Sequence, residues 1–220
     1  MAERKTPRIS SRKQPKQARS NELVSAILEA ALHVLAREGA QRFTTTRVAE
    51  RAGVSVGSIY QYFPNKAAIL FRLQSDEWQR TSGMMCRILE GQDRPPSERL
   101  RALVHAFVRS ECEEADMRIA LNDAAPLYRD VPEAQEARAA AAQAMLRFMQ
   151  EALPDASPTE HQQVNDIITV TLSAVGKGFS QSPRTPEEVE AYADALADMF
   201  CAYLKSRGHG KFREASASTN

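Results

Sequence analysis

Residues 44–66 read TTTRVAERAGVSVGSIYQYFPNK, and this stretch predicts two short helices joined by a tight turn. The first helix is expected over about 45–52 and the second over about 56–62. Gly53 lies between them, where a positive φ is least costly for glycine. Two such helices form a helix-turn-helix, whose second helix reads the major groove of DNA. A helical hairpin without a nucleic-acid role shares this spacing, so the motif alone leaves both interpretations open.

Four residues mark the boundaries of these helices. Thr44 and Ser55 each precede a helix and carry the hydroxyl that an N-cap needs. Pro64 ends the second helix, because the residue before a proline is restricted to extended conformations. Asn65 can then cap a third and longer helix. We therefore expect local hydrogen bonds to set where each helix begins and ends.

The longer string AGVSVGSIYQYFPNK, over residues 52–66, resembles the TetR family of bacterial transcriptional regulators. The close likeness covers about residues 19–72 and includes the apolar run at 27–31 and Gly39. Beyond that segment it extends only as an all-helical pattern. The pieces that carry the resemblance are Thr44-Thr45, Val48-Ala49, Ala52-Gly53-Val54-Ser55, Gly57, Ile59-Tyr60, Tyr62-Phe63 and Asn65-Lys66.

Charge is distributed unevenly along the 220 residues, although the net charge is only +1. Residues 1–72 contain 13 of the 29 Lys and Arg and 5 of the 28 Asp and Glu, a balance of +8. The other 16 and 23 give residues 73–220 a balance of −7. A basic head on an acidic body is typical of a DNA-binding module joined to a separate domain. Charge that only keeps the protein soluble is the simpler alternative.

The first 19 residues are predicted to form a disordered basic arm. Two roles stay open: contact with phosphates or the minor groove beside the main DNA site, or a solvated leader. The basic residues of the arm are Arg4, Lys5, Arg8, Arg12, Lys13, Lys16 and Arg19, against the single acid Glu3.

The rest of the chain predicts helices and no strands, because no useful stretch alternates with period two. Ser157 and Thr185 each begin a capping box with proline at the first helical position. The expected helices run over about 20–38, 65–90, 97–112, 116–123, 133–153, 158–181 and 186–206, in addition to the two of the reading motif.

Several classes of protein find no support in the sequence. Cys86, Cys112 and Cys201 are far apart, so neither a zinc site nor a disulfide framework is indicated, and a cytoplasmic protein is expected. The acids around Cys112 disfavour its thiolate and argue against a redox sensor. No apolar run is long enough to span a membrane, and no cofactor, metal site or catalytic residue is predicted.

The resemblance implies an all-α protein with a three-helix DNA-binding domain and a C-terminal helical bundle for ligand binding and dimerisation. We expect the arm at 1–19, the DNA-binding domain at 20–66, the effector and dimerisation domain at 67–207, and a flexible tail at 208–220. The helices at 158–181 and 186–206 would form a homodimer. Their apolar faces, and the small Gly176 and Gly178, favour close approach, and a role of these faces in monomer core is the alternative.

The resemblance also implies a DNA site. Phosphate contacts are expected from Thr44, Tyr60, Tyr62 and Lys66. Other residues could face bases or sugars: Thr46, Arg47, Ser55, Val56, Gly57, Ser58 and Gln61. The second helix is poor in the Arg, Asn and Gln that make bidentate base contacts. We therefore expect Arg47 and apolar contacts with thymine methyls to carry much of the specificity.

An effector pocket is implied for the body, and flexible Met and aromatic side chains suit an apolar or planar ligand. For each candidate, plain core packing is the simpler alternative, and for His105 that alternative is a satisfied core histidine. The candidates are Trp78, Met85, His105, Phe107, Cys112, Met117, Tyr128, Phe148, Met149 and Phe179.

The sequence therefore predicts a dimeric DNA-binding repressor that binds a palindromic operator and is released by a small apolar or aromatic effector. Its two reading helices would meet half-sites about 34 Å apart or a wider register. The alternatives are an all-α DNA-binding protein without effector control and an α-helical enzyme. The sequence shows no nucleophile–base pair or phosphate-binding loop that would support an enzyme.

Overall fold

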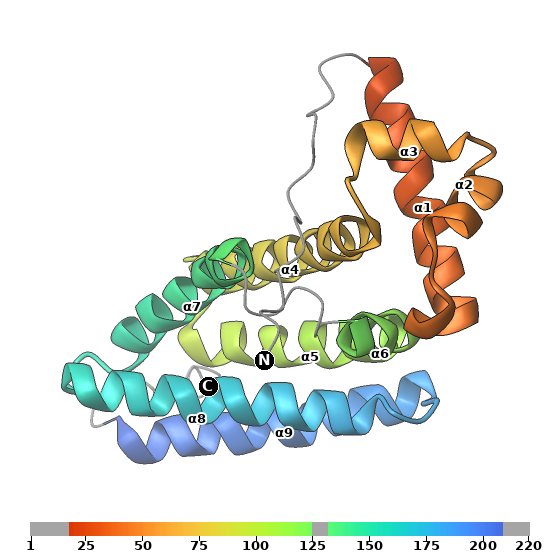
Figure 1. Ribbon diagram of the computed structural model, residues 1–220. Helices are drawn as coiled ribbons and strands as arrows, with labels where there is room; N and C mark the ends of the chain where they lie inside the picture. The colour runs from red at the N-terminus through yellow and green to blue at the C-terminus, as the bar shows by residue number, and fades with distance from the viewer. Residues whose placement is uncertain (1–17, 125–131, 209–220) are drawn as a thin grey trace, which may run out of the picture. The chain divides into compact units, whose positions relative to one another are not determined.

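The computed structural model describes residues 18–124 and 132–208, and those residues form helices and no strands (Figure 1). The predicted all-α class is therefore confirmed, and every predicted helix is found within a few residues of its expected bounds. The helices are α1 (Ala18–Arg42), α2 (Thr45–Ala52), α3 (Val56–Tyr62), α4 (Lys66–Glu90), α5 (Pro96–Glu113), α6 (Ala115–Ala124), α7 (Pro132–Ala152), α8 (Pro158–Phe179) and α9 (Pro186–Arg207).

The predicted caps set the bounds of α2, α3 and α4. Thr44 Oγ1 accepts the Arg47 N–H at 3.3 Å, and Ser55 Oγ accepts the Ser58 N–H at 3.0 Å. Between the two helices, Gly53 has φ 67, the left-handed conformation that glycine adopts at least cost. Asn65 Oδ1 accepts the Ala68 N–H at 2.9 Å at the start of α4. Each bond satisfies a backbone donor that would otherwise lack a partner at a helix start.

The first helix continues beyond its predicted end at residue 38. Gly39 has φ 72 and ψ 170 and interrupts the helical conformation there, and the chain then continues to Arg42. Phe43 follows and is fully buried, as is Val48, which lies one turn into α2. The break at Gly39 thus turns the chain so that this apolar pair can hold the entry to α2.

Both predicted capping boxes are present at the starts of α8 and α9. The Ser157 N–H donates to Glu160 Oε2 at 2.8 Å, and Ser157 Oγ accepts the Glu160 N–H at 3.3 Å. Thr185 and Glu188 make the same pair of bonds at 2.9 and 3.3 Å. The two helix starts are therefore determined by residues three positions apart.

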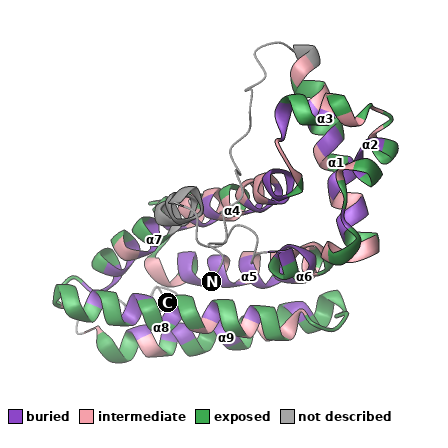
Figure 2. Cartoon of the chain, viewed as in Figure 1, coloured by how far each residue is buried: buried purple, intermediate pink, exposed green. Residues whose placement is uncertain are grey.

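The chain divides into two compact units, which differ from the predicted division at residue 66. The first contains the described residues of Met1–Gln79 and Asp116–Ala137, and the second those of Arg80–Ala115 and Arg138–Asn220. Buried residues line the helix faces of each unit (Figure 2). In the first unit, α6 contributes Leu121 to the same core as Ile59 of α3 and Leu70 of α4.

The first unit also contains an ion pair between α4 and α6. Arg118 Nη1 lies 2.7 Å from Glu77 Oε1, and both side chains are largely buried. Removing one partner of a buried pair is costly, because the other charge is left uncompensated. The pair therefore ties α6 to α4 within this unit.

The core of the second unit forms where α5 packs against α8 and α9, with α7 contributing Phe148 and Met149. Gly176 of α8 lies where a Cβ would come within 2.9 Å of Phe107 Cε1 on α5. Nothing lies within 4 Å of the corresponding atom at Gly178. The close helix approach expected between protomers at Gly176 thus occurs within the chain, because the glycine makes room for the Phe107 ring.

Candidate nucleic-acid interface

The scaffold of the reading motif is buried, and its predicted contact residues lie mostly at the surface. Ile59 of α3 and Val48 of α2 are fully buried, and Phe63 after α3 is nearly so. These side chains hold α3 against α2 and leave its opposite face free. Of the predicted DNA contacts, those exposed or partly exposed are Thr44, Thr46, Arg47, Ser55, Val56, Gly57, Ser58, Tyr60, Gln61 and Lys66.

Tyr62 and Tyr60 occupy different environments, although the resemblance implied phosphate contacts for both. Tyr62 is 6% exposed, and its hydroxyl is 2.7 Å from Ser20 Oγ on α1. Tyr60 is 41% exposed, and its hydroxyl is 3.3 Å from Thr45 Oγ1. The structure thus gives Tyr62 an intramolecular partner that sequence reasoning missed. No local pattern indicates this contact, because 42 positions separate the two residues.

Several polar side chains of the motif contact neighbours within it or just before it. Ser55 Oγ and Ser58 Oγ lie 2.8 Å apart, and Lys66 Nζ donates to the Phe43 carbonyl at 3.5 Å. The guanidinium of Arg47 contacts the carboxylate of Glu38 on α1. Each of these groups therefore has an intramolecular partner before any DNA is bound.

The predicted effector residues are divided between the two units. Trp78 and Met117 pack against the core of the first unit. Tyr128 lies outside the described residues. The candidates that belong to the core of the second unit, or pack against it, are Met85, Phe107, Cys112, Phe148, Met149 and Phe179. The Phe179 ring stacks on the Tyr192 ring of α9, with ring centroids 3.9 Å apart.

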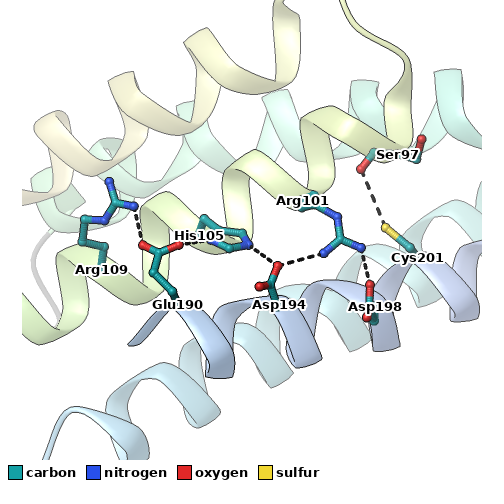
Figure 3. A network of polar contacts seen from close by, with 8 residues as sticks. All are labelled: Ser97, Arg101, His105, Arg109, Glu190, Asp194, Asp198 and Cys201. Atoms are coloured by element: carbon teal, nitrogen blue, oxygen red, sulfur yellow. Dashed lines mark hydrogen bonds and ion pairs between the residues drawn. The ribbon is translucent and has the colours of Figure 1, made fainter. Parts of the chain in front are cut away.

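His105 lies in a row of ion pairs between α5 and α9 (Figure 3). Its Nδ1 is 3.0 Å from Glu190 Oε2 and its Nε2 is 3.1 Å from Asp194 Oδ1. Arg109 Nη2 donates to Glu190 Oε1 at 2.6 Å, and Arg101 pairs with Asp194 and Asp198. His105 is therefore a half-buried hydrogen-bond partner of two α9 carboxylates rather than an apolar core residue.

A signal for this row was present in the sequence. The basic residues of α5 recur every fourth position from Arg101 to Arg109, and so do the acidic residues of α9 from Glu190 to Asp198. Residues four apart share one face of a helix, so two such rows of opposite charge are complementary when the helices are antiparallel. The pattern predicts a charged face on each helix, and only the fold determines that the two faces meet.

The row predicts a pH dependence of stability through Glu190. Hydrogen bonds from Arg109 and then from His105 lower the pKa of this carboxyl below its ordinary value of 4.5. A lowered folded-state pKa contributes stability above the unfolded-state value, and this contribution is lost as pH falls through the folded-state pKa. Glu190→Gln should therefore lower the urea midpoint at pH 7, and the difference from wild type should shrink at about pH 3.5.

Glu113→Gln on α5 is the matched control for removing one exposed carboxylate. Urea titrations of the three proteins at both pH values would measure the effect. A difference between wild type and Glu190→Gln that is equal at the two pH values would contradict the assigned role of the ion pairs.

Burial affects the thiol groups of Cys112 and Cys201. It raises the pKa of Cys112; Arg184 opposes this shift, and Glu111 and Glu113 add to it. Burial also raises the pKa of Cys201, whose Sγ lies 3.7 Å from the Ser97 carbonyl oxygen. The direction of the Cys112 shift agrees with the predicted suppression of its thiolate, with burial as the larger cause.

Neither a metal-binding cluster nor a membrane-spanning helix is found among the described residues. Among residues 18–124 and 132–208, no group of three His, Cys, Asp or Glu side chains is arranged to hold a metal ion. No helix in that part of the chain has the length and apolar character needed to cross a membrane.

Two family models match this chain. The model described as bacterial regulatory proteins, tetR family, matches residues 27–73. The model described as tetracyclin repressor-like, C-terminal domain, matches residues 95–206. The first match covers α2 and α3 and most of α1, and the second covers α5 to α9 almost completely.

Similar proteins of known role include regulators and a nucleoid occlusion factor. The HTH-type transcriptional repressor KstR of Rhodococcus jostii (strain RHA1) is 29% identical over 136 residues, which are 62% of each chain. The nucleoid occlusion factor SlmA of Vibrio vulnificus is 34% identical over 83 residues, 37% of this chain and 42% of that protein. The chain thus aligns with less than two thirds of the length of these relatives.

Solved structures share the fold at low sequence identity. The fatty acid degradation regulator FadR from Bacillus halodurans has a TM-score of 0.65 at 17% identity, covering 85% of this chain and 96% of that one. The regulator FadR from Bacillus subtilis, in complex with stearoyl-CoA, has a TM-score of 0.59 at 16% identity, covering 80% and 96%. These similarities concern the fold alone.

Proposed function

Because the chain belongs to the TetR family of bacterial regulatory proteins, we propose that it is a repressor that binds a palindromic operator as a dimer and is released by a small apolar or aromatic effector. The observation that carries the DNA-binding part is the division of the reading motif into a buried scaffold and an exposed face. Exposed hydroxyl, amide and guanidinium groups on one small surface suit phosphate and base contacts. The excess of basic residues in 1–72 favours the same partner.

The proposed contacts are the ten exposed or partly exposed residues of the predicted set, with Tyr62 supporting α3 through Ser20. The test is selection of bound sequences from random duplex DNA by the full chain. Recovery of a discrete palindrome supports an operator-binding regulator. Recovery of no preferred sequence would favour the alternative of a general DNA-coating protein.

Arg47→Ala tests whether Arg47 determines which DNA sequence the protein binds. Because α3 offers mainly Gln61 and small side chains, we expect Arg47 to carry much of the base discrimination. The substitution should weaken operator binding by about 1–3 kcal/mol and relax selectivity at one position in each half-site. Fluorescence anisotropy with operators altered one base pair at a time would measure both effects. An equal loss on every sequence would instead identify Arg47 as a phosphate contact.

The proposed dimer surface consists of α8 and α9. Large apolar side chains are exposed on both helices: Ile167 and Val170 are 41% and 66% exposed, and Met199 is 49% exposed. Small exposed residues continue each stripe at helical spacing, with Ala174 on α8 and Ala191, Ala195 and Ala202 on α9. A stripe of this kind is costly in water and is stabilised when a second copy covers it.

The effector part of the proposal concerns the second unit. Its core and margins contain several Met and Phe side chains, which suit an apolar ligand. The stearoyl-CoA complex of Bacillus subtilis FadR makes a long acyl chain a reasonable first probe. Titration of the operator complex with acyl-CoA thioesters and with planar aromatic compounds would test release, because a ligand that couples to DNA must change operator affinity. A regulator without effector control would show no change with any compound.

A further inference from the structure

The ion pair between Glu38 and Arg47 joins the last turn of α1 before Gly39 to the first turn of α2. The backbone fixes both ends of this pair. Gly39, with φ 72, interrupts α1 directly after Glu38, and the N–H of Arg47 itself donates to the Thr44 cap at 3.3 Å. The side chains of Arg47 and Glu38 are 45% and 30% exposed. The guanidinium is therefore accessible at the surface while it contacts a carboxylate.

The contact matters because Arg47 is the richest hydrogen-bond donor among the residues proposed to meet DNA. A guanidinium has five N–H groups in a rigid fork, which match a carboxylate, a phosphate or a guanine edge equally well. Any DNA contact by Arg47 therefore forms at the cost of the contact that it already makes with Glu38. Glu38 also adds a negative charge to a surface that would face phosphates.

We propose that Glu38 is a specificity-determining residue that competes with DNA for Arg47; the inference rests on the proposed operator-binding function. At the operator, a paired set of base acceptors in the groove engages the guanidinium, so its contact with Glu38 must be given up. On a random duplex no such set is present, and Arg47 can keep its contact with Glu38. Glu38 thus lowers binding to the operator more than binding to random DNA.

The experiment compares Glu38→Gln with wild type in the full chain. Gln has the same shape but lacks the charge, so it weakens the hold on Arg47 and keeps the helix intact. Affinity for the selected operator should rise by roughly three- to tenfold, the size of the free energy of one surface ion pair. Affinity for a random duplex should rise less, so the ratio of specific to random binding should rise.

Glu29→Gln is the matched control, because Glu29 is an exposed carboxylate on the same helix. It reports the general effect of removing one negative charge from the DNA-binding unit. A second comparison places Glu38→Gln in an Arg47→Gln background, where the extra gain on the operator should disappear. Circular dichroism and operator binding confirm that each variant is folded.

The outcomes separate the inference from the function on which it rests. Equal rises in operator binding for Glu38→Gln and Glu29→Gln would overturn competition by Glu38. A fall in operator affinity for Glu38→Gln as large as that for Arg47→Ala would also overturn it, since Glu38 would then orient Arg47 for DNA. If wild type selects no palindrome, the proposed function fails, whatever the variants do.

Discussion

Replacing Val170 with glutamate is expected to convert the proposed dimer to monomers and to weaken operator binding by about 100-fold or more. Val170 is the most exposed large apolar side chain on α8, at 66%. At an interface between identical surfaces, each protomer would bring one glutamate into an apolar contact, where its charge loses its hydration. Loss of the dimer removes the second reading helix from the complex, and with it the gain from two linked contacts.

Thr169→Glu on the same helix is the matched control, because Thr169 is exposed and adjacent in sequence but lies about 100° around the helix from Val170. Analytical ultracentrifugation would give the oligomeric state, and anisotropy with the selected operator would give the affinity. If Val170→Glu stays a dimer and binds as tightly as Thr169→Glu, this face of α8 is not the dimer surface.

Gly176→Leu is expected to lower the free energy of unfolding by about 3 kcal/mol. A Cβ at this position would lie 2.9 Å from Phe107 Cε1 and 3.2 Å from Glu111 Cγ. Both of these α5 residues are buried, so neither can move away without disturbing the packing of the second unit. The added side chain must therefore separate α8 from α5.

Gly178→Ala tests whether the effect depends on this contact rather than on the loss of a glycine, with a methyl group small enough for the proposed dimer surface. Nothing within the chain lies within 4 Å of its Cβ position, and alanine favours a helix more than glycine does. The control is therefore expected to raise stability by about 0.5–1 kcal/mol. Urea unfolding at one protein concentration would measure both variants, since dimer stability depends on concentration. Similar losses in the two variants would contradict the intrachain role of Gly176.

The helices of the reading motif could be predicted almost completely because their ends depend on nearby residues. Thr44, Ser55 and Asn65 each accept an N–H from three positions ahead, and Gly53 occupies the one turn that needs a positive φ. Such contacts form in any chain with these residues at these spacings. The capping boxes at Ser157 and Thr185 were predictable for the same reason.

The candidate site was less predictable, because a residue type does not determine which partner it finds. Tyr62 was expected to contact phosphate from its position in the motif, and the fold places Ser20 against its hydroxyl. The Met and Phe residues proposed for an effector site illustrate a related problem. Their composition suits either a ligand or a core, and both uses bury the same side chains.

The sequence by itself determined the class of fold, the helix boundaries and the reading motif, since these depend on hydrophobic periodicity and on contacts within one turn. Only the tertiary structure decided which charges meet: Glu38 with Arg47, and the basic face of α5 with the acidic face of α9. It also decided that α6 shares a core with the reading motif and that Gly176 serves the packing of α5. These contacts join residues of different helices, and the unfolded chain could form many other pairings of similar energy. Only the packing of the helices determines which pairings form.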